Sequence, residues 1–230
     1  MKIIRLVLTL MTAFVFVVGS VGCTTAPPTI QSGPDAEVSF DGLHKVDNTR
    51  VDEAWAVPDL DLSSYLNILP VNGGVEYREV KDRGSTFTAR SRGGPYFIDD
   101  KARAEFEALV DKIIKEELQK SNRFDIVDEP GPNTLIVSGG LLNVTSQVPP
   151  DPIGGRSRIY LSSVGDATLV LEVRDSETNR ILARAVDRRA AETIGGSFTQ
   201  SNSVTNTAEI RRLLRYWGSL VREALEGFTR

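Results

Sequence analysis

ATLVLEVRDSETNRILARAVDRRA, residues 167–190, is the stretch that predicts a β-hairpin in this chain. In its first half apolar residues alternate with polar ones, at Ala167, Leu169, Leu171 and Val173. This period of two places one face of a strand against a core. Asp175 and Asn179 suit a type I turn that is closed by a left-handed residue. We therefore expect antiparallel strands at about 167–174 and 180–190.

Two amphipathic helices are predicted on either side of the strand-rich middle of the chain. Between residues 99 and 120 apolar side chains recur at intervals of three and four, and Asp99 or Asp100 can cap the first turn. We expect Asn122 to end this helix in a left-handed turn. The same spacing continues from Asn206 to about residue 228, and Glu209 gives the start a capping-box pattern.

Further strands are expected at 65–71, 124–127 and 134–145. Asn72-Gly73-Gly74 predicts a turn after the first of them, and 80–94 reads as a long polar loop. The pair Gly139-Gly140 indicates a bulge or a close backbone approach within the third. The resulting order predicts an α+β fold, with an antiparallel sheet of about four to five strands and two main helices packed on one face. Trp217 is expected to be a core anchor.

The first 37 residues have the composition of an export signal and a tether. Lys2 and Arg5 precede an apolar run, and small residues precede Cys23, the single cysteine of the chain. We interpret 1–22 as a signal peptide that is removed and 23–37 as a flexible, Pro-rich tether. Residues 38–230 are then one domain. The apolar run breaks too early for a transmembrane helix.

The junction before the cysteine resembles the bacterial lipobox, although Ser20 stands where Leu is usual. Val21, Gly22 and Cys23 match the pattern. The resemblance implies that Cys23 carries diacylglyceryl and palmitate-type acyl chains, and more than one chain anchors a protein stably in a membrane. Thr24 lacks the aspartate retention signal, which favours the periplasmic face of the bacterial outer membrane. Ordinary cleavage that leaves a free thiol is the alternative.

Several segments of the chain look like those of bacterial lipoproteins in the domain of unknown function 3313 family. They cover most of residues 40 to 228, and Leu69 departs from the pattern because an aspartate is usual before Pro70. The family has no settled activity, so the resemblance implies only a fold and a location in the cell envelope. The element order is also remotely similar to the amino-terminal domain of the periplasmic Tol protein. The matching phrases are 40–43, 58–65, 126–132, 173–178, 186–189 and the final Trp-containing helix.

The sequence offers little catalytic chemistry. His44 is the single histidine and has no cysteine companion, so neither a zinc site nor a Ser-His-Asp triad is expected. No phosphate-binding glycine motif occurs, and we expect no metal and no cofactor. With 27 basic and 31 acidic residues, the formal net charge of −4 also argues against nucleic-acid binding. Asp99 and Asp100 could form a carboxylate pair, but helix capping explains them with fewer assumptions.

Basic residues in two loops are the candidate partner-binding site. Arginine suits carboxylate and phosphate groups, and loops on a rigid scaffold commonly carry binding. A solvated loop without a role is the competing interpretation. We expect a lipid-anchored, non-catalytic interaction or scaffold module whose candidate partners are an envelope protein, peptidoglycan or lipopolysaccharide. A carboxylate-based hydrolase or a small-ligand-binding lipoprotein is the alternative. The candidate residues are Arg78, Lys81, Arg83, Arg90, Arg92, Arg156 and Arg158.

Overall fold

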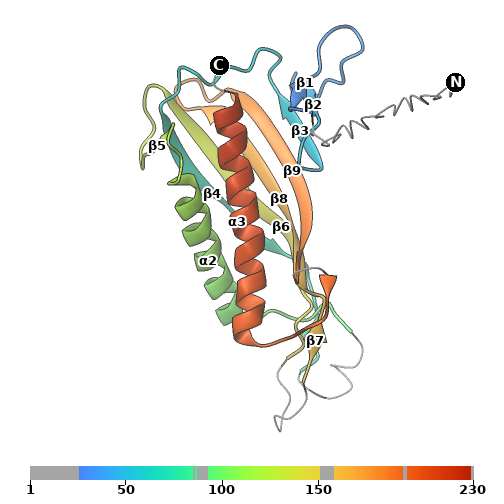
Figure 1. Ribbon diagram of the computed structural model, residues 1–230. Helices are drawn as coiled ribbons and strands as arrows, with labels where there is room; N and C mark the ends of the chain where they lie inside the picture. Colours follow the sequence, from blue (N-terminus) through green and yellow to red (C-terminus); the bar gives the residue numbers. More distant parts are fainter. Residues whose placement is uncertain (1–25, 85, 87–92, 151–157, 194–195, 229–230) are drawn as a thin grey trace, which may run out of the picture.

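The computed structural model of the chain describes residues 26–84, 86, 93–150, 158–193 and 196–228. One large sheet carries two long helices, α2 (Asp100–Leu118) and α3 (Ser203–Gly227), which lie side by side across one of its faces (Figure 1). The predicted α+β fold with two main helices is therefore confirmed. The predicted leader and Cys23 lie outside the described residues. No helix of the described part is long and apolar enough to cross a membrane.

The sheet has eight strands in the order β1-β2-β3-β9-β8-β6-β4-β5. It is larger than the predicted four to five strands, and it is mixed because β4 runs parallel to both β5 and β6. α2 carries the chain back along the sheet, so the next two strands, β5 and β6, run in the same direction as β4. The strands are β1 (Thr29–Ile30), β2 (His44–Asp47), β3 (Glu53–Ala56), β4 (Asn67–Tyr77), β5 (Asp125–Ile126), β6 (Thr134–Ser146), β8 (Ser163–Asp175) and β9 (Ile181–Glu192), with a separate pair β7 (Tyr160–Leu161) and β10 (Thr199–Gln200).

The hairpin of β8 and β9 is confirmed. The backbone amide of Asn179 donates to the carbonyl of Asp175 at 2.9 Å, and the carboxylate of Asp175 accepts the amide of Thr178 at 2.7 Å. Asn179 has a φ of 58°, the left-handed conformation that the turn requires. Apolar residues at odd positions of β8 face the helices. The opposite face carries ion pairs such as Arg184 with Glu172.

Two predicted helix ends need correction. Asp99 caps α2 as expected, and its carboxylate accepts the amide of Ala102 at 2.8 Å. However, α2 ends at Leu118 with Gln119 as the cap, before Asn122. The cap of α3 is Asn202 rather than Asn206, because Asn202 accepts two free amides and Thr205 completes the reciprocal bond.

The predicted turn at Asn72-Gly73-Gly74 is wrong, since β4 continues to Tyr77. The glycines form an irregularity in the pairing of β4 with β6, between Asn72 and Val75. A Cβ on Gly73 would lie 3.0 Å from the carbonyl oxygen of Gly139. The close backbone approach expected at Gly139-Gly140 is therefore present, because only glycine lets the two backbones lie this close, and the extra residue of the irregularity belongs to β4.

Part of the predicted tether is structured. Thr29 and Ile30 form β1, which pairs antiparallel with β2 at the edge of the sheet. Gln31 continues the contact, because its carbonyl lies 2.8 Å from Nδ1 of His44. The segment that links the domain to Cys23 is therefore shorter than the 23–37 range suggests.

Candidate functional site: a cavity between the helices and the sheet

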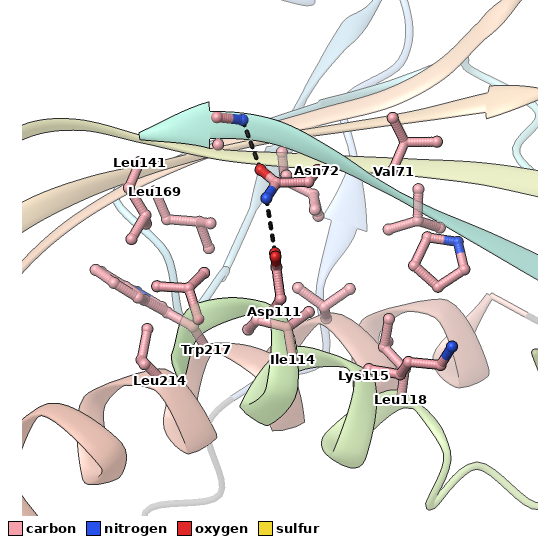
Figure 2. Close-up of a pocket in the computed structure, with 18 residues that line it drawn as sticks. Val71, Asn72, Asp111, Ile114, Lys115, Leu118, Leu141, Leu169, Leu214 and Trp217 are labelled. Carbon is pink, nitrogen blue, oxygen red and sulfur yellow. Dashed lines mark hydrogen bonds between the residues drawn. The ribbon is translucent and has the colours of Figure 1, made fainter. Parts of the chain in front are cut away.

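An apolar cavity of about 260 Å³ lies between α2, α3 and the strands β4, β6 and β8. Figure 2 shows Leu141 and Leu169 pointing from the sheet toward Leu214 and Trp217 of α3. Protein interiors rarely contain voids much larger than a water molecule. A space of this size is therefore a feature of the site and needs an explanation.

The glycines of β6 explain the space. Gly139 lies between Val137 and Leu141, two buried residues on the helix-facing side of the strand. A Cβ at Gly139 would meet only Leu171, at 3.8 Å. Without a side chain at this position, the floor beneath α2 stays open.

The mouth of the cavity lies beside α2 and is polar. The side-chain amide of Asn72 donates to Asp111 at 2.7 Å, and its oxygen accepts the amide of Gly74 at 2.6 Å. These bonds are visible in Figure 2 and hold the irregular part of β4 against α2. Lys115 stands next to them and pairs with Asp128 at 3.6 Å.

A second apolar cavity of about 190 Å³ lies nearer the loops. Its lining includes Ile98, Phe106 and Ala167. Leu214 and Trp217 line both cavities, so these two side chains form the partition between them. Empty cavities with apolar walls stay dry, and one of about 150 Å³ in another protein accepts benzene. Both cavities here exceed that size.

Trp217 is held by a buried carboxylate. Its Nε1 donates to Asp187 at 2.7 Å, and both side chains are 1% exposed. Asp187 also accepts from Nε of Arg189 at 2.6 Å and from the backbone amide of Asp52 at 3.2 Å. The guanidinium of Arg189 in turn stacks on the ring of Tyr216 at 4.5 Å. The expectation that Trp217 anchors the core is confirmed, and the partition it forms is fixed in position.

The predicted basic residues that the structure describes do not all line one depression. Lys81 and Arg83 line a depression of about 280 Å³ together with Asp99, whereas Arg158 is not among its described lining residues. Arg78 lies on the other side of Tyr96, close to Asp166. Three further candidates, Arg90, Arg92 and Arg156, lie outside the described residues.

The charge of Arg78 acts on a neighbouring carboxylate, that of Asp166. Burial alone would raise the pKa of this carboxyl, but hydrogen bonds from Thr145 at 2.6 Å and Arg188 at 2.9 Å outweigh it. The charges of Arg188 and Arg78 lower the pKa further, so that it falls below the usual 3.8. Arg78 therefore contributes to the local balance of charge at the end of β8.

Arg103 is a residue that the sequence did not single out. Its guanidinium lies 4.7 Å from the ring centre of Tyr77 and 5.9 Å from that of Phe97. Tyr77 donates to Glu107 at 3.1 Å, and burial followed by this bond raises the pKa of Tyr77 well above its usual value. A lone arginine on an amphipathic helix carries no sequence signal, since only the fold brings the two rings to it.

The described residues contain no group of three or more His, Cys, Asp or Glu side chains suited to a metal ion. Asp99 is used as a helix cap, and Asp100 begins α2 and is not among the described residues that line the basic depression. The arrangement that the geometry does offer is a partly open apolar space with polar residues at its edge, which can accommodate an apolar group.

Fold and site together define an α+β fold in which two helices lie over one face of a mixed sheet, with apolar space between them. The chain belongs to the DUF3313 family of proteins of unknown function, whose model matches residues 39–221. The resemblance noted in the sequence is thus confirmed. No curated protein matches the chain.

Solved structures show remote similarity. Protein XCC0632 from Xanthomonas campestris, a member of the family model DUF330, is 12% identical, with 78% of this chain and 92% of that chain covered and a TM-score of 0.42. The PelC dodecamer from Paraburkholderia phytofirmans is 9% identical, with 73% and 96% covered and a TM-score of 0.34. Protein CT253 from Chlamydia trachomatis is 13% identical, with 70% and 96% covered and a TM-score of 0.32. With TM-scores below 0.5, these similarities carry no functional argument.

Proposed function

We propose that this protein is a binding module that holds an apolar chain in the space between its helices and its sheet. The observation that carries the proposal is the cavity of about 260 Å³ over Gly139, with its polar mouth at Asn72 and Asp111. Small-molecule sites are typically concave and mostly apolar, with a few polar groups that orient the ligand. The proposed role is binding and involves no catalysis.

The energy of an empty cavity supports this reading. The apolar walls stay uncovered in the empty protein, and covering apolar surface stabilises by about 25 cal/mol per Å². A ligand that fills the space recovers much of this free energy, which gives the cavity an affinity for apolar groups.

The test uses 1-octanol as a neutral apolar probe and a variant that fills the cavity. We expect 1-octanol to raise the unfolding midpoint of the wild type, because a ligand that binds only the folded state stabilises it. In Gly139→Ile the new side chain occupies the cavity floor, so the probe should raise the midpoint less than it does in the wild type. The variant itself should be more stable by about 2 kcal/mol, from burial of one aliphatic side chain.

Ser138→Val is the matched control. Ser138 precedes Gly139 on β6 and pairs with Glu172 on the polar face of the sheet. Apolar bulk is thus added outside the cavity, and this variant should respond to 1-octanol like the wild type. Equal responses from Gly139→Ile and the wild type, or no response from any of them, would rule out binding in this cavity.

We further propose that the module is fastened to the periplasmic face of the outer membrane through Cys23. Five residues link Cys23 to β1, and the six Cα–Cα steps across them span at most about 20 Å. β1 and β2 lie at the end of the molecule opposite to β7 (Figure 1), so the anchor would hold β7 away from the bilayer. Cys23→Ser should release the protein from membranes or leave an unprocessed precursor, and unchanged fractionation would overturn the anchor.

The predicted docking of an anionic envelope partner on the basic loops remains a second proposal. Lys81 and Arg83, which share one depression, are the described residues that support it. Crosslinking from Arg83 in intact cells is the direct test, and recovery of no protein, glycan or lipid would count against it. The similarity to the Tol domain stays a hypothesis, and no step of either proposal rests on it.

A further inference from the structure

Three hollows adjoin one another between the basic loop and the apolar interior. The depression at Lys81 shares Tyr96 and Phe97 with a narrow space of about 10 Å³. That narrow space shares Tyr77 and Ile98 with the second apolar cavity. A series of adjoining spaces thus leads from exposed cations to the partition formed by Trp217.

Arg103 stands at the narrow point of this series. Its guanidinium lies close to the rings of Tyr77 and Phe97, and its Nε donates to the carbonyl of Ile98 at 3.0 Å. Within the described ranges, no carboxylate lies at ion-pair distance from Arg103. The side chain is half-buried, so a positive group with unused donors faces the end of an apolar cavity.

The unused hydrogen-bond donors of Arg103 favour an anion, since Glu107, one turn further along α2, already accepts from Tyr77 at 3.1 Å. Lys81 and Arg83 line the adjoining depression, and the two carboxylates there are already used by backbone amides. Asp82 accepts from Gly84 at 2.8 Å, and Asp99 accepts from Ala102 at 2.8 Å. Guanidinium groups bind carboxylates through paired, charge-assisted hydrogen bonds, which lysine and neutral donors do not reproduce.

We propose that Arg103 binds the carboxylate of a single-chain anionic amphiphile whose alkyl chain lies in the cavity of about 190 Å³ beyond Ile98. This inference rests on the proposed binding of apolar chains and adds the chemical class of the ligand. The carboxylate lies at the narrow point, between the cations and the apolar wall. The chain extends toward Leu214 and Trp217, which line the cavity.

The test compares octanoate with 1-octanol, which have equal chain length and differ in charge at pH 8. We expect the wild type to bind octanoate about tenfold more tightly than 1-octanol, as measured by isothermal titration calorimetry. In Arg103→Gln the affinity for octanoate should fall to that for 1-octanol, while the affinity for 1-octanol stays unchanged. Unchanged binding of 1-octanol also shows that the variant is folded.

Two further variants separate the head group from the chain. Lys101→Gln removes a cation from the same turn of α2, but Lys101 is 85% exposed and pairs with Glu105 on the solvent side, so both affinities should stay at the wild-type values. Ala167→Leu fills the second cavity and should weaken both ligands alike.

The outcomes distinguish this inference from the proposed function. Equal binding of octanoate and 1-octanol by the wild type, or equal octanoate affinities in Arg103→Gln and the wild type, would overturn the role of Arg103 and leave apolar binding in place. Absence of binding by either ligand would overturn both. A loss of octanoate preference in Lys101→Gln would assign it to diffuse charge and would also overturn the role of Arg103.

Discussion

Replacement of Asp187 by alanine tests the buried contact that joins α3 to the sheet. Asp187 is 1% exposed and accepts hydrogen bonds from Trp217, Arg189 and the amide of Asp52. The substitution leaves the indole N–H without a partner inside the core, and it removes the counter-charge of Arg189. The cavities remain, but the partition between them loses its attachment.

The expected loss follows from the exposure of the two donors. Removing one partner of a buried ion pair costs about 3–5 kcal/mol. The side chain of Arg189 is 37% exposed and can turn to solvent, whereas the indole nitrogen cannot. We therefore expect a loss of about 3 kcal/mol, which corresponds to roughly 6–12 °C in the unfolding midpoint of a domain of this size.

Urea unfolding followed by tryptophan fluorescence measures the loss by linear extrapolation. Asp187→Asn keeps an acceptor for Trp217 and should lose less than Asp187→Ala. Glu105→Ala is the surface control, because its pair with Lys101 at 3.8 Å is solvent-exposed and contributes below about 0.5 kcal/mol. A loss below about 1 kcal/mol in Asp187→Ala would refute the idea that this carboxylate fixes α3 on the sheet.

Three other predictions concern pH, helix capping and backbone packing. Burial and a hydrogen bond to Asp175 raise the pKa of Tyr65 to about 12, so the neutral phenol stabilises the fold below pH of about 10 and this contribution is lost between about 10 and 12. Urea unfolding should show a decline over that window that is absent from Tyr65→Phe. Asn202→Ala should cost about 1 kcal/mol in thermal unfolding because it removes the cap of α3, and an equal or larger loss in Asn206→Ala would contradict that assignment. Gly73→Ala places a Cβ 3.0 Å from a carbonyl oxygen of β6 and should cost about 1–3 kcal/mol, whereas a midpoint equal to the wild type would show that β4 can move away.

Short sequence patterns correctly predicted strands, turns and helix caps that depend on residues close together in the chain. The alternation along β8, the turn from Asp175 to Asn179 and the cap at Asp99 each depend on residues a few positions apart, and all three are present. The prediction failed for the cap of α3, because Asn202 and Asn206 both suit a cap and only the path of the preceding chain chooses between them. The short strands β2 and β3 have too few residues to show a period.

The sequence also contained partial signals of the candidate site. Gly139 and Gly140 indicated a close backbone approach, and Trp217 was expected in the core. Nothing in the sequence indicated that the helix-facing glycine leaves a cavity, because its volume depends on how far α2 stands from the sheet. The contact of Arg103 with Tyr77 and Phe97 likewise joins separate elements.

By itself, then, the sequence determined the two helices, the central hairpin and the family, since periodicity and short-range hydrogen bonds specify them. Only the tertiary structure decided the parallel pairing of β4, the burial of Asp187 and the two apolar cavities. These features depend on contacts between residues far apart in the chain, such as the 30 positions between Asp187 and Trp217. Such contacts form only after the helices have packed on the sheet, because their free energy comes from removing side chains from water together.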